Sequence, residues 1–497
     1  MRTSLLLLFL LPSLASAQEE FVITIETTLG DTTETFWLQI PADYNPASPC
    51  PLLVGWHQWG GDHLEFRDAT NFDAIADQAG WIAASHFGAG YFHWNNHATQ
   101  SHVVDMIAWI AENYSIDADR IYMVGASMGG AAAMIFSNNH LDPDGPMVAA
   151  AASVSGIQDC ERRFYEQGVN HTMIQSFGGT PDQVPFEYHR NSAIYFADST
   201  ESMHFNARHL PLALTFGAEW SDSVWRCHAE DLYTVMEGFA DSVVLFESSL
   251  YGHGWGASED LMIYNFLSGF TLKRYPTDIS INADAEGDWY WAELTLREPL
   301  ESFARFDASF DSSSHPPAVH VDFINNVASA ALDLPSLGYD YDSGNLFCYW
   351  NIDDALPAEL SFIGISEEPY KLLKNSFVTA DWSYDAGDQS LTLYSDASAA
   401  WTIVLDASTN HPNLPEKHPF PPITTSQNPL TLHFGLPGNA PVTWSLYNVL
   451  GQQIERRILS GGLVRLPRHL PSGLYLGLLE STNPAYPRHL QKIILTR

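Results

Sequence analysis

The sequence predicts an α/β protein whose first half is a doubly wound, mainly parallel sheet and whose second half is built from β strands. In residues 18–275, short apolar runs alternate with segments whose apolar residues recur at helical spacing, which is typical of a sheet covered on both faces. In residues 276–408 the helical spacing disappears and short alternating runs replace it. The length of 497 residues exceeds what one core usually supports, so we expect several domains.

The elements of the first region can be assigned in order along the chain. Its two opening strands form a hairpin around Gly30-Asp31. All its strands are expected at residues 21–26, 35–40, 52–56, 81–85, 121–124, 148–155, 212–216 and 242–246. Helices are expected at residues 72–79, 100–114, 129–138 and 229–239. Residues 157–210 form a long insertion between two strands, and such a segment is often a lid or a substrate-shaping element.

The domain limits follow from changes in composition. Arg2, an apolar run at residues 5–11 and Ala15-Ser16-Ala17 predict a signal peptide over residues 1–17, cleaved after Ala17. We expect the first domain at 18–275, a β-sandwich at 276–408, a proline-rich linker at 409–422 and a small C-terminal β-sandwich-like domain at 423–497. No later segment has ~20 consecutive apolar residues, so we expect export without a transmembrane segment.

The charge and the cysteines exclude several classes of partner. The chain has 59 acidic against 22 basic residues, and its net charge of -37 repels phosphate backbones, so nucleic acid is not expected to bind. The four cysteines lack the close pairs of zinc sites, and neither a metal nor an organic cofactor is expected. Cys160 and Cys227 could form a disulfide in an oxidising compartment, or all four thiols could be unpaired.

A nucleophile motif lies between a predicted strand and a predicted helix. Residues 125–129 read G-x-S-x-G, directly after the apolar run 121–124. A strand-to-helix turn this tight leaves no room for side chains beside the serine, which explains the flanking glycines. Ser127 is therefore the expected nucleophile, and the following helix directs its first N–H groups toward developing negative charge.

A serine hydroxyl needs a neighbouring base, and His253 is the best placed of the 20 histidines. It follows the last predicted strand between Gly252 and Gly254, as the order serine, acid, histidine requires. The acid is expected in the loop after strand 212–216, where Asp222 and Glu219 compete. We favour Asp222, because the acid of such a triad usually lies shortly before an apolar residue.

The loops around the expected pocket supply the remaining candidates. Two backbone N–H groups are needed where negative charge develops; Met128 is the first, and Trp59 is favoured over Gln58 as the second. Four tryptophans fall in loops at the carboxyl ends of the strands, where a sugar ring or an aromatic acyl group could stack on them, although they could equally pack the loops. They are Trp59, Trp220, Trp225 and Trp255.

Residues 21–275 resemble the prolyl-oligopeptidase-like and the feruloyl-esterase or polyester-depolymerase-like branches of the α/β hydrolases. The resemblance lies in segments 116–122, 178–181 and 191–197 as well as in the serine motif. It implies hydrolysis through a covalent acyl-enzyme by Ser127, His253 and an acid. The chain departs from the pattern at the acid loop, which has an extra residue, and at Gln58, where glycine is common.

The C-terminal region resembles the sorting domains of bacterial proteins exported by type nine secretion. Its matching segments are 427–430, 446–452 and 470–475. The resemblance implies that the secretion machinery is a partner and that the protein is released or held at the cell surface. A small β module for binding or spacing is the alternative.

Together these features predict a secreted serine hydrolase, with a carboxylesterase as the first hypothesis. Its substrates would be acyl esters linked to polysaccharides, or a polyester. A prolyl-oligopeptidase-like peptidase is the alternative within enzymes, because the same triad serves both reactions. A non-catalytic binding protein on the same fold is the alternative from another class.

Overall fold

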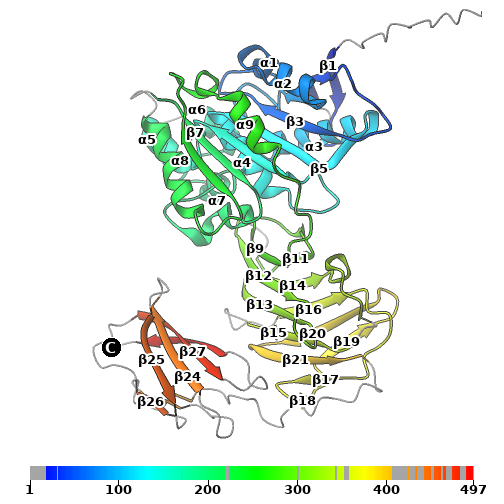
Figure 1. Ribbon diagram of the computed structural model, residues 1–497, viewed down its shortest axis with the longest axis vertical. Helices are drawn as coiled ribbons and strands as arrows, with labels where there is room; N and C mark the ends of the chain where they lie inside the picture. Colours follow the sequence, from blue (N-terminus) through cyan, green and yellow to red (C-terminus); the bar gives the residue numbers. More distant parts are fainter. Residues whose placement is uncertain are drawn as a thin grey trace, which may run out of the picture. The chain divides into compact units, whose positions relative to one another are not determined.

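The computed structural model describes residues 18–30, 32–168, 171–218, 223–298, 301–341, 344–351 and 358–405, together with short strands beyond residue 423 (Figure 1). The chain divides into two compact units, one of residues 1–368 with 381–399 and one of residues 369–380 with 400–497. Among the helices in these ranges, none has the length and apolar character needed to cross a membrane.

The first unit begins with an eight-stranded sheet in the order β1-β2-β4-β3-β5-β6-β7-β8, which is the strand order of an α/β hydrolase. β1 and β2 pair antiparallel, and all neighbours from β4 to β8 are parallel, so the predicted α/β fold class is confirmed. The strands are β1 (Glu19–Glu26), β2 (Thr33–Ile40), β3 (Cys50–Trp56), β4 (Ile82–His86), β5 (Ile116–Ala126), β6 (Ala150–Val154), β7 (Leu212–Phe216) and β8 (Val243–Glu247).

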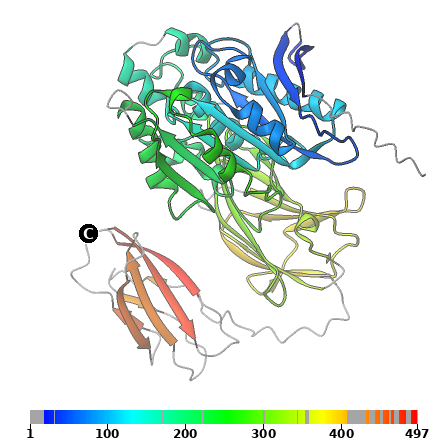
Figure 2. The same ribbon diagram turned by 45° about the horizontal axis from the view of Figure 1, so that its top comes forward.

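Helices cover both faces of this sheet, as both ribbon views show (Figures 1 and 2). Adjacent residues of β3 belong to opposite cores, since Leu52 and Val54 pack with one set of helices and Leu53 with the other. A strand buried on both faces explains the continuous apolar runs of the sequence. One face carries α3 (His97–Asn113), α4 (Met128–Asn139) and α8 (Ser223–Met236); the other carries α1 (Glu65–Ala69), α2 (Phe72–Ala79) and α9 (Asp260–Leu267).

The long insertion between β6 and β7 is mostly helical. Asp159 caps its first helix by accepting a hydrogen bond from Arg162 N. The ring nitrogens of His189 each lie 2.8 Å from a carboxylate oxygen, one of Glu161 and one of Glu201, and this ties three of the short helices together. These helices are α5 (Cys160–Gln167), α6 (His171–Phe177), α7 (Pro185–Arg190), η1 (Ser199–Glu201) and η2 (Met203–Ala207).

Two β-rich groups of strands complete the first unit. Burial alternates strictly along β12, as expected for a strand with one face in a core. One group runs β15-β13-β12-β9 and the other β10-β11-β14-β16-β20-β19. Their bounds are β9 (Asp278–Ala283), β10 (Gly287–Trp289), β11 (Ala292–Leu296), β12 (Ala304–Asp311), β13 (Ala318–Asn325), β14 (Val327–Leu332), β15 (Leu346–Trp350), β16 (Ala358–Ile363), β19 (Trp382–Asp385) and β20 (Ser390–Ser395).

The second unit is also built from strands, which include a four-stranded antiparallel sheet in the order β25-β24-β27-β28. The signal peptide at 1–17 and the linker at 409–422 lie outside the described residues, so these assignments stay predictions. The strands are β17 (Lys371–Lys374), β18 (Phe377–Val378), β21 (Ala399–Val404), β22 (Thr424–Thr425), β23 (Thr431–His433), β24 (Val442–Asn448), β25 (Gln453–Leu459), β26 (Leu463–Arg465), β27 (Gly473–Ser481) and β28 (His489–Leu495).

The four cysteines are free thiols, so Cys160 and Cys227 do not form a disulfide. Cys160 is buried, and its Sγ donates a hydrogen bond to the carbonyl of Asn191 at 3.1 Å. Burial raises the pKa of this thiol to about 12, which keeps it protonated and unreactive.

Candidate active site

The serine lies at a sharp bend between β5 and α4. Ser127 has φ 56° and ψ -117°, a strained conformation for a residue other than glycine. Its backbone N–H donates to Val154 O at 2.8 Å, which holds the bend against the neighbouring strand. A Cβ at Gly125 would overlap the carbonyl of Gly129, and a Cβ at Gly129 would overlap the carbonyl of Trp56. The predicted tight strand-to-helix turn, and the need for its glycines, are therefore confirmed.

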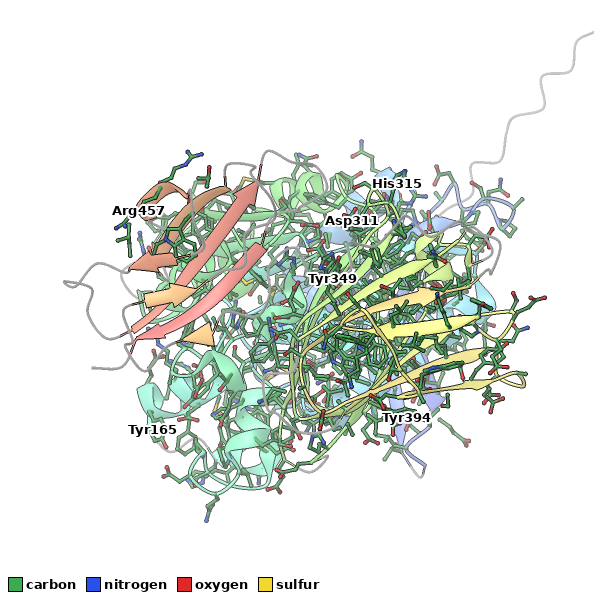
Figure 3. All side chains as sticks on the ribbon, turned by 90° about the horizontal axis from the view of Figure 1, so that it is seen from below. Tyr165, Asp311, His315, Tyr349, Tyr394 and Arg457 are labelled. Carbon is green, nitrogen blue, oxygen red and sulfur yellow. The ribbon has the colours of Figure 1, made fainter. Side chains whose placement is uncertain are left out.

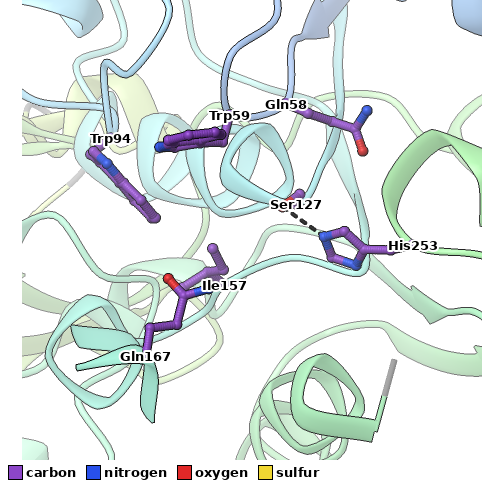
Figure 4. Close-up of a pocket in the computed structure, with 7 residues that line it drawn as sticks. All are labelled: Gln58, Trp59, Trp94, Ser127, Ile157, Gln167 and His253. Atoms are coloured by element: carbon purple, nitrogen blue, oxygen red, sulfur yellow. Dashed lines mark hydrogen bonds between the residues drawn. The ribbon is translucent and has the colours of Figure 1, made fainter. Parts of the chain in front are cut away.

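His253 faces the serine from the loop after β8. Its Nε2 lies 2.9 Å from Ser127 Oγ (Figure 4). The flanking glycines both have positive φ, 127° at Gly252 and 60° at Gly254, a region that other residues rarely adopt. Ser127 is only 6% exposed, whereas the His253 side is half-buried. The fold thus brings together the two residues that the sequence analysis placed at the centre of the site.

Two backbone N–H groups remain available beside this pair. Met128 N begins α4, and the first N–H groups of a helix have no acceptor within the helix. In the loop after β3, Gln58 N donates to Glu65 Oε2 at 2.7 Å and Gly60 N donates to Tyr91 O at 2.8 Å. The hydrogen bonds among the described residues leave the Trp59 N–H without an acceptor, which favours Trp59 over Gln58 as the second donor.

The Gln58 side chain connects the Trp59 loop with the His253 loop. Its Nε2 donates to Glu65 Oε1 at 3.0 Å, and its Oε1 accepts from Trp255 N at 3.2 Å. A Cβ at Gly254 would overlap the same Oε1 and displace it from Trp255 N, in addition to the constraint of the positive φ. Sequence reasoning singled out Gln58 as a departure from the pattern of similar proteins, but it missed the role of Glu65.

The pair opens into a pocket of about 430 Å³. Trp59 and Trp94 form one wall, and the Oγ1 of Thr172 in α6 accepts hydrogen bonds from both indole N–H groups, at 3.2 and 2.9 Å. The insertion therefore shapes the pocket, as expected. Sequence reasoning missed Trp94, Ile157 and Gln167. The pocket residues drawn in Figure 4 are Gln58, Trp59, Trp94, Ser127, Ile157, Gln167 and His253.

The other predicted site residues have different outcomes. Trp255 does not line the pocket: it is 4% exposed and packs against Phe66 with ring centroids 5.6 Å apart, so its assignment to substrate binding is wrong. Its backbone enters a short helix, η4 (Gly254–Ala257), which turns the indole toward the apolar core. Glu219, Trp220 and Asp222 lie outside the described residues. Trp225 lies in α8, and its side chain is not described.

Three buried histidines, His57, His86 and His93, pack against one another. The rings of His57 and His93 are 4.7 Å apart, and His86 lies 5.7 Å from His93. Burial, reinforced by neighbouring His57, holds the pKa of His86 and of His93 well below its ordinary value, so both are neutral. Among the described side chains, no group of three or more His, Cys, Asp or Glu could hold a metal ion. The rings of His86 and His93 also pack against Trp56, with centroids 4.1 and 6.1 Å away.

The strand order, the strained serine and the facing imidazole define the arrangement of an α/β hydrolase. No protein-family model matches the chain. Feruloyl esterase B of Talaromyces stipitatus is 25% identical over 164 residues, which are 31% of this chain and 44% of that protein. A bifunctional acetylxylan esterase/xylanase of Neocallimastix patriciarum is 28% identical over 122 residues, 24% of this chain and 18% of that protein.

Among solved structures, a ferulic acid esterase matches 50% of this chain and 97% of its own, at 14% identity and a TM-score of 0.39. The chain spans less than half the length of the curated relatives that it matches. The sequence similarity is therefore confined to part of each relative.

Proposed function

We propose that this protein is a secreted carboxylesterase that cleaves ester bonds through an acyl-enzyme on Ser127. One observation carries the proposal: Ser127 Oγ lies 2.9 Å from His253 Nε2, at a strained bend before a helix N-terminus. The similarity to feruloyl and acetylxylan esterases supports an ester substrate. We propose acyl esters linked to a polysaccharide as the substrate class, with a polyester as the alternative.

In the acylation step, His253 Nε2 takes the proton of Ser127 as Oγ forms a bond with the ester carbonyl carbon. The carbonyl oxygen becomes an oxyanion, which accepts hydrogen bonds from the Met128 and Trp59 N–H groups. Each such donor is worth ~3 kcal/mol of transition-state stabilisation. The intermediate then collapses: the bond to the alcohol oxygen breaks, and the proton on Nε2 passes to the departing alcohol.

In the second step, His253 takes a proton from water, and the hydroxide oxygen attacks the acyl carbon. The bond to Ser127 Oγ breaks, the serine regains its proton and the carboxylic acid leaves. We propose Asp222 as the acid that orients the imidazole and stabilises its charged form, with Glu219 as the alternative. The step needs no group beyond the protein and water.

The test is hydrolysis of p-nitrophenyl esters, feruloyl and acetyl sugar esters and peptide amides by the wild type and by Ser127→Ala. We expect turnover of esters by the wild type and loss of at least about a thousandfold in kcat for Ser127→Ala. Ser137→Ala, a buried serine of the same helix, is the matched control and should retain activity. Faster release from peptides would support the peptidase, and no turnover of any substrate would support a binding protein.

We also propose that the protein is exported. The support is the signal-peptide pattern at residues 1–17 and the resemblance of residues 423–497 to sorting domains. The secretion machinery would then be a partner of the C-terminal region. N-terminal sequencing of protein recovered outside the cells tests the first step. A mature chain that begins at Gln18 supports the proposal, whereas an intact Met1 in an exported protein contradicts the cleavage.

A further inference from the structure

Three large aromatic side chains stand exposed at the rim of the pocket. Trp59 is 53% exposed, Tyr91 51% and Phe92 38%, although rings of this size are mostly buried in folded proteins. They are contiguous: the ring centroids of Trp59 and Phe92 are 4.5 Å apart, and those of Phe92 and Tyr91 are 6.4 Å apart. Isolated exposed rings need no explanation, but a contiguous group beside a pocket indicates a binding surface.

We call Trp59, Phe92 and Tyr91 the rim strip. Hydrogen bonds to neighbouring residues hold this strip in place. The backbone of its two loops is joined by the hydrogen bond from Gly60 N to Tyr91 O, at 2.8 Å. The Trp59 indole is fixed on Thr172, and Ser176 Oγ of the same helix donates to Phe92 O at 2.8 Å. A surface held in this way loses little conformational freedom when it binds a ligand.

The rim strip starts at the reacting centre and leads away from it. Trp59 lines the pocket and provides the N–H proposed for the oxyanion, whereas Tyr91 and Phe92 are not among the residues that line the pocket. A ligand on the strip would therefore be continuous with an ester in the pocket but would extend beyond it. This geometry suits the chain of a polymeric substrate rather than a small acyl group, which the pocket itself can hold.

The chemistry of the strip favours a neutral sugar chain. The faces of aromatic rings are electron-rich, and the C–H groups on the face of a sugar ring can pack against them. The net charge of -37 disfavours a polyanionic chain. We propose that the rim strip is a subsite for the neutral polysaccharide that carries the ester, beside the pocket in which the ester is cleaved. This proposal rests on the esterase function proposed above.

The kinetic test uses Tyr91→Ala/Phe92→Ala, which leaves Trp59 and its N–H in place. For each variant, kcat/KM is measured on acetylated xylan and on p-nitrophenyl acetate. We expect the ratio of the two values to fall about tenfold through a higher KM on xylan. Tyr394→Ala is the matched control: it removes a ring of similar exposure, 39%, from β20 (Figure 3), and should leave the ratio unchanged. An unchanged ratio in the double variant, or an equal loss on both esters, overturns the proposal.

A binding test separates this proposal from the esterase proposal. Two proteins are compared by native gel electrophoresis: Ser127→Ala and the triple variant that also carries Tyr91→Ala/Phe92→Ala. Their migration in gels that contain unesterified soluble xylan is measured against gels without it. We expect Ser127→Ala to be retarded and the triple variant to migrate freely. This result would support the rim strip even if the wild type cleaved no ester. Equal migration of the two proteins, or binding to polyester particles but not to xylan, overturns the assignment to a sugar chain.

Discussion

The replacement of Glu65 by glutamine tests whether the loop that carries Trp59 must be held for catalysis. The Glu65 carboxylate accepts from Gln58 N at 2.7 Å and from Gln58 Nε2 at 3.0 Å, and it touches neither Ser127 nor His253 by hydrogen bonding. Glutamine keeps nearly the same volume but offers one acceptor oxygen in place of two. One of the two Gln58 donors would then face an amide NH₂ group.

The size of the effect follows from these two hydrogen bonds. A hydrogen bond to a charged group is worth ~1.5–3 kcal/mol, and losing one allows the Trp59 N–H to move away from the oxyanion position. An oxyanion donor is worth ~3 kcal/mol, which sets the upper limit. Since ~1.4 kcal/mol corresponds to a tenfold change in rate, we expect kcat to fall about 10- to 100-fold. KM should change little, because the oxyanion exists only after attack.

The assay is steady-state hydrolysis of p-nitrophenyl acetate, with thermal unfolding measured on the same preparations. Asp68→Asn is the matched control, because it removes a carboxylate of the same helix whose side chain is 59% exposed and contacts Arg67. It should retain the wild-type kcat. If Glu65→Gln were folded and as fast as the wild type, the connection from Glu65 through Gln58 to the reacting centre would be refuted.

Further predictions concern stability. Gly129→Ala should lower the free energy of unfolding in urea by ~3 kcal/mol or prevent folding, because its Cβ would overlap the Trp56 carbonyl. The control is Gly145→Ala, where the Cβ has ordinary contacts and which should cost less than ~1 kcal/mol. Burial lowers the pKa of His140 to about 3, so the folded protein keeps this ring neutral while the unfolded chain protonates it below ~6.5. The free energy of unfolding is therefore unaffected by this histidine above that pH. It falls as the pH drops further, by ~2 kcal/mol at about pH 5, because only the unfolded chain binds the proton. His140→Phe should reduce this pH dependence. If the free energy of unfolding of the variant had the same slope against pH as that of the wild type, the lowered pKa of His140 would be contradicted.

The serine and the histidine of the site could be predicted because local sequence determines their surroundings. The bend at Ser127 needs glycine on both sides, and an apolar strand before it and small residues after it identify the turn without tertiary information. The place of His253 after the last strand, together with its flanking glycines, identifies it as the base. The order of the parallel strands brings these two loops to the same edge of the sheet.

The walls of the pocket could not be predicted, because they depend on which way each ring turns. Trp255 and Trp94 both lie in loops near the site, but Trp255 turns into the core against Phe66, while Trp94 is held at the pocket by Thr172. Thr172 belongs to an insertion whose position follows from tertiary packing alone. The contact of Glu65 with Gln58 likewise needs the turn between them to be known in space.

The most direct test of the central claim is labelling of the native protein with a fluorophosphonate probe, followed by peptide mapping in a mass spectrometer. Such a probe reacts with a serine hydroxyl only when a neighbouring base and an oxyanion site activate it. We expect an adduct on Ser127 that is absent from Ser127→Ala and forms much more slowly in His253→Ala. Native protein that takes up no label, or label that persists in Ser127→Ala, would contradict it.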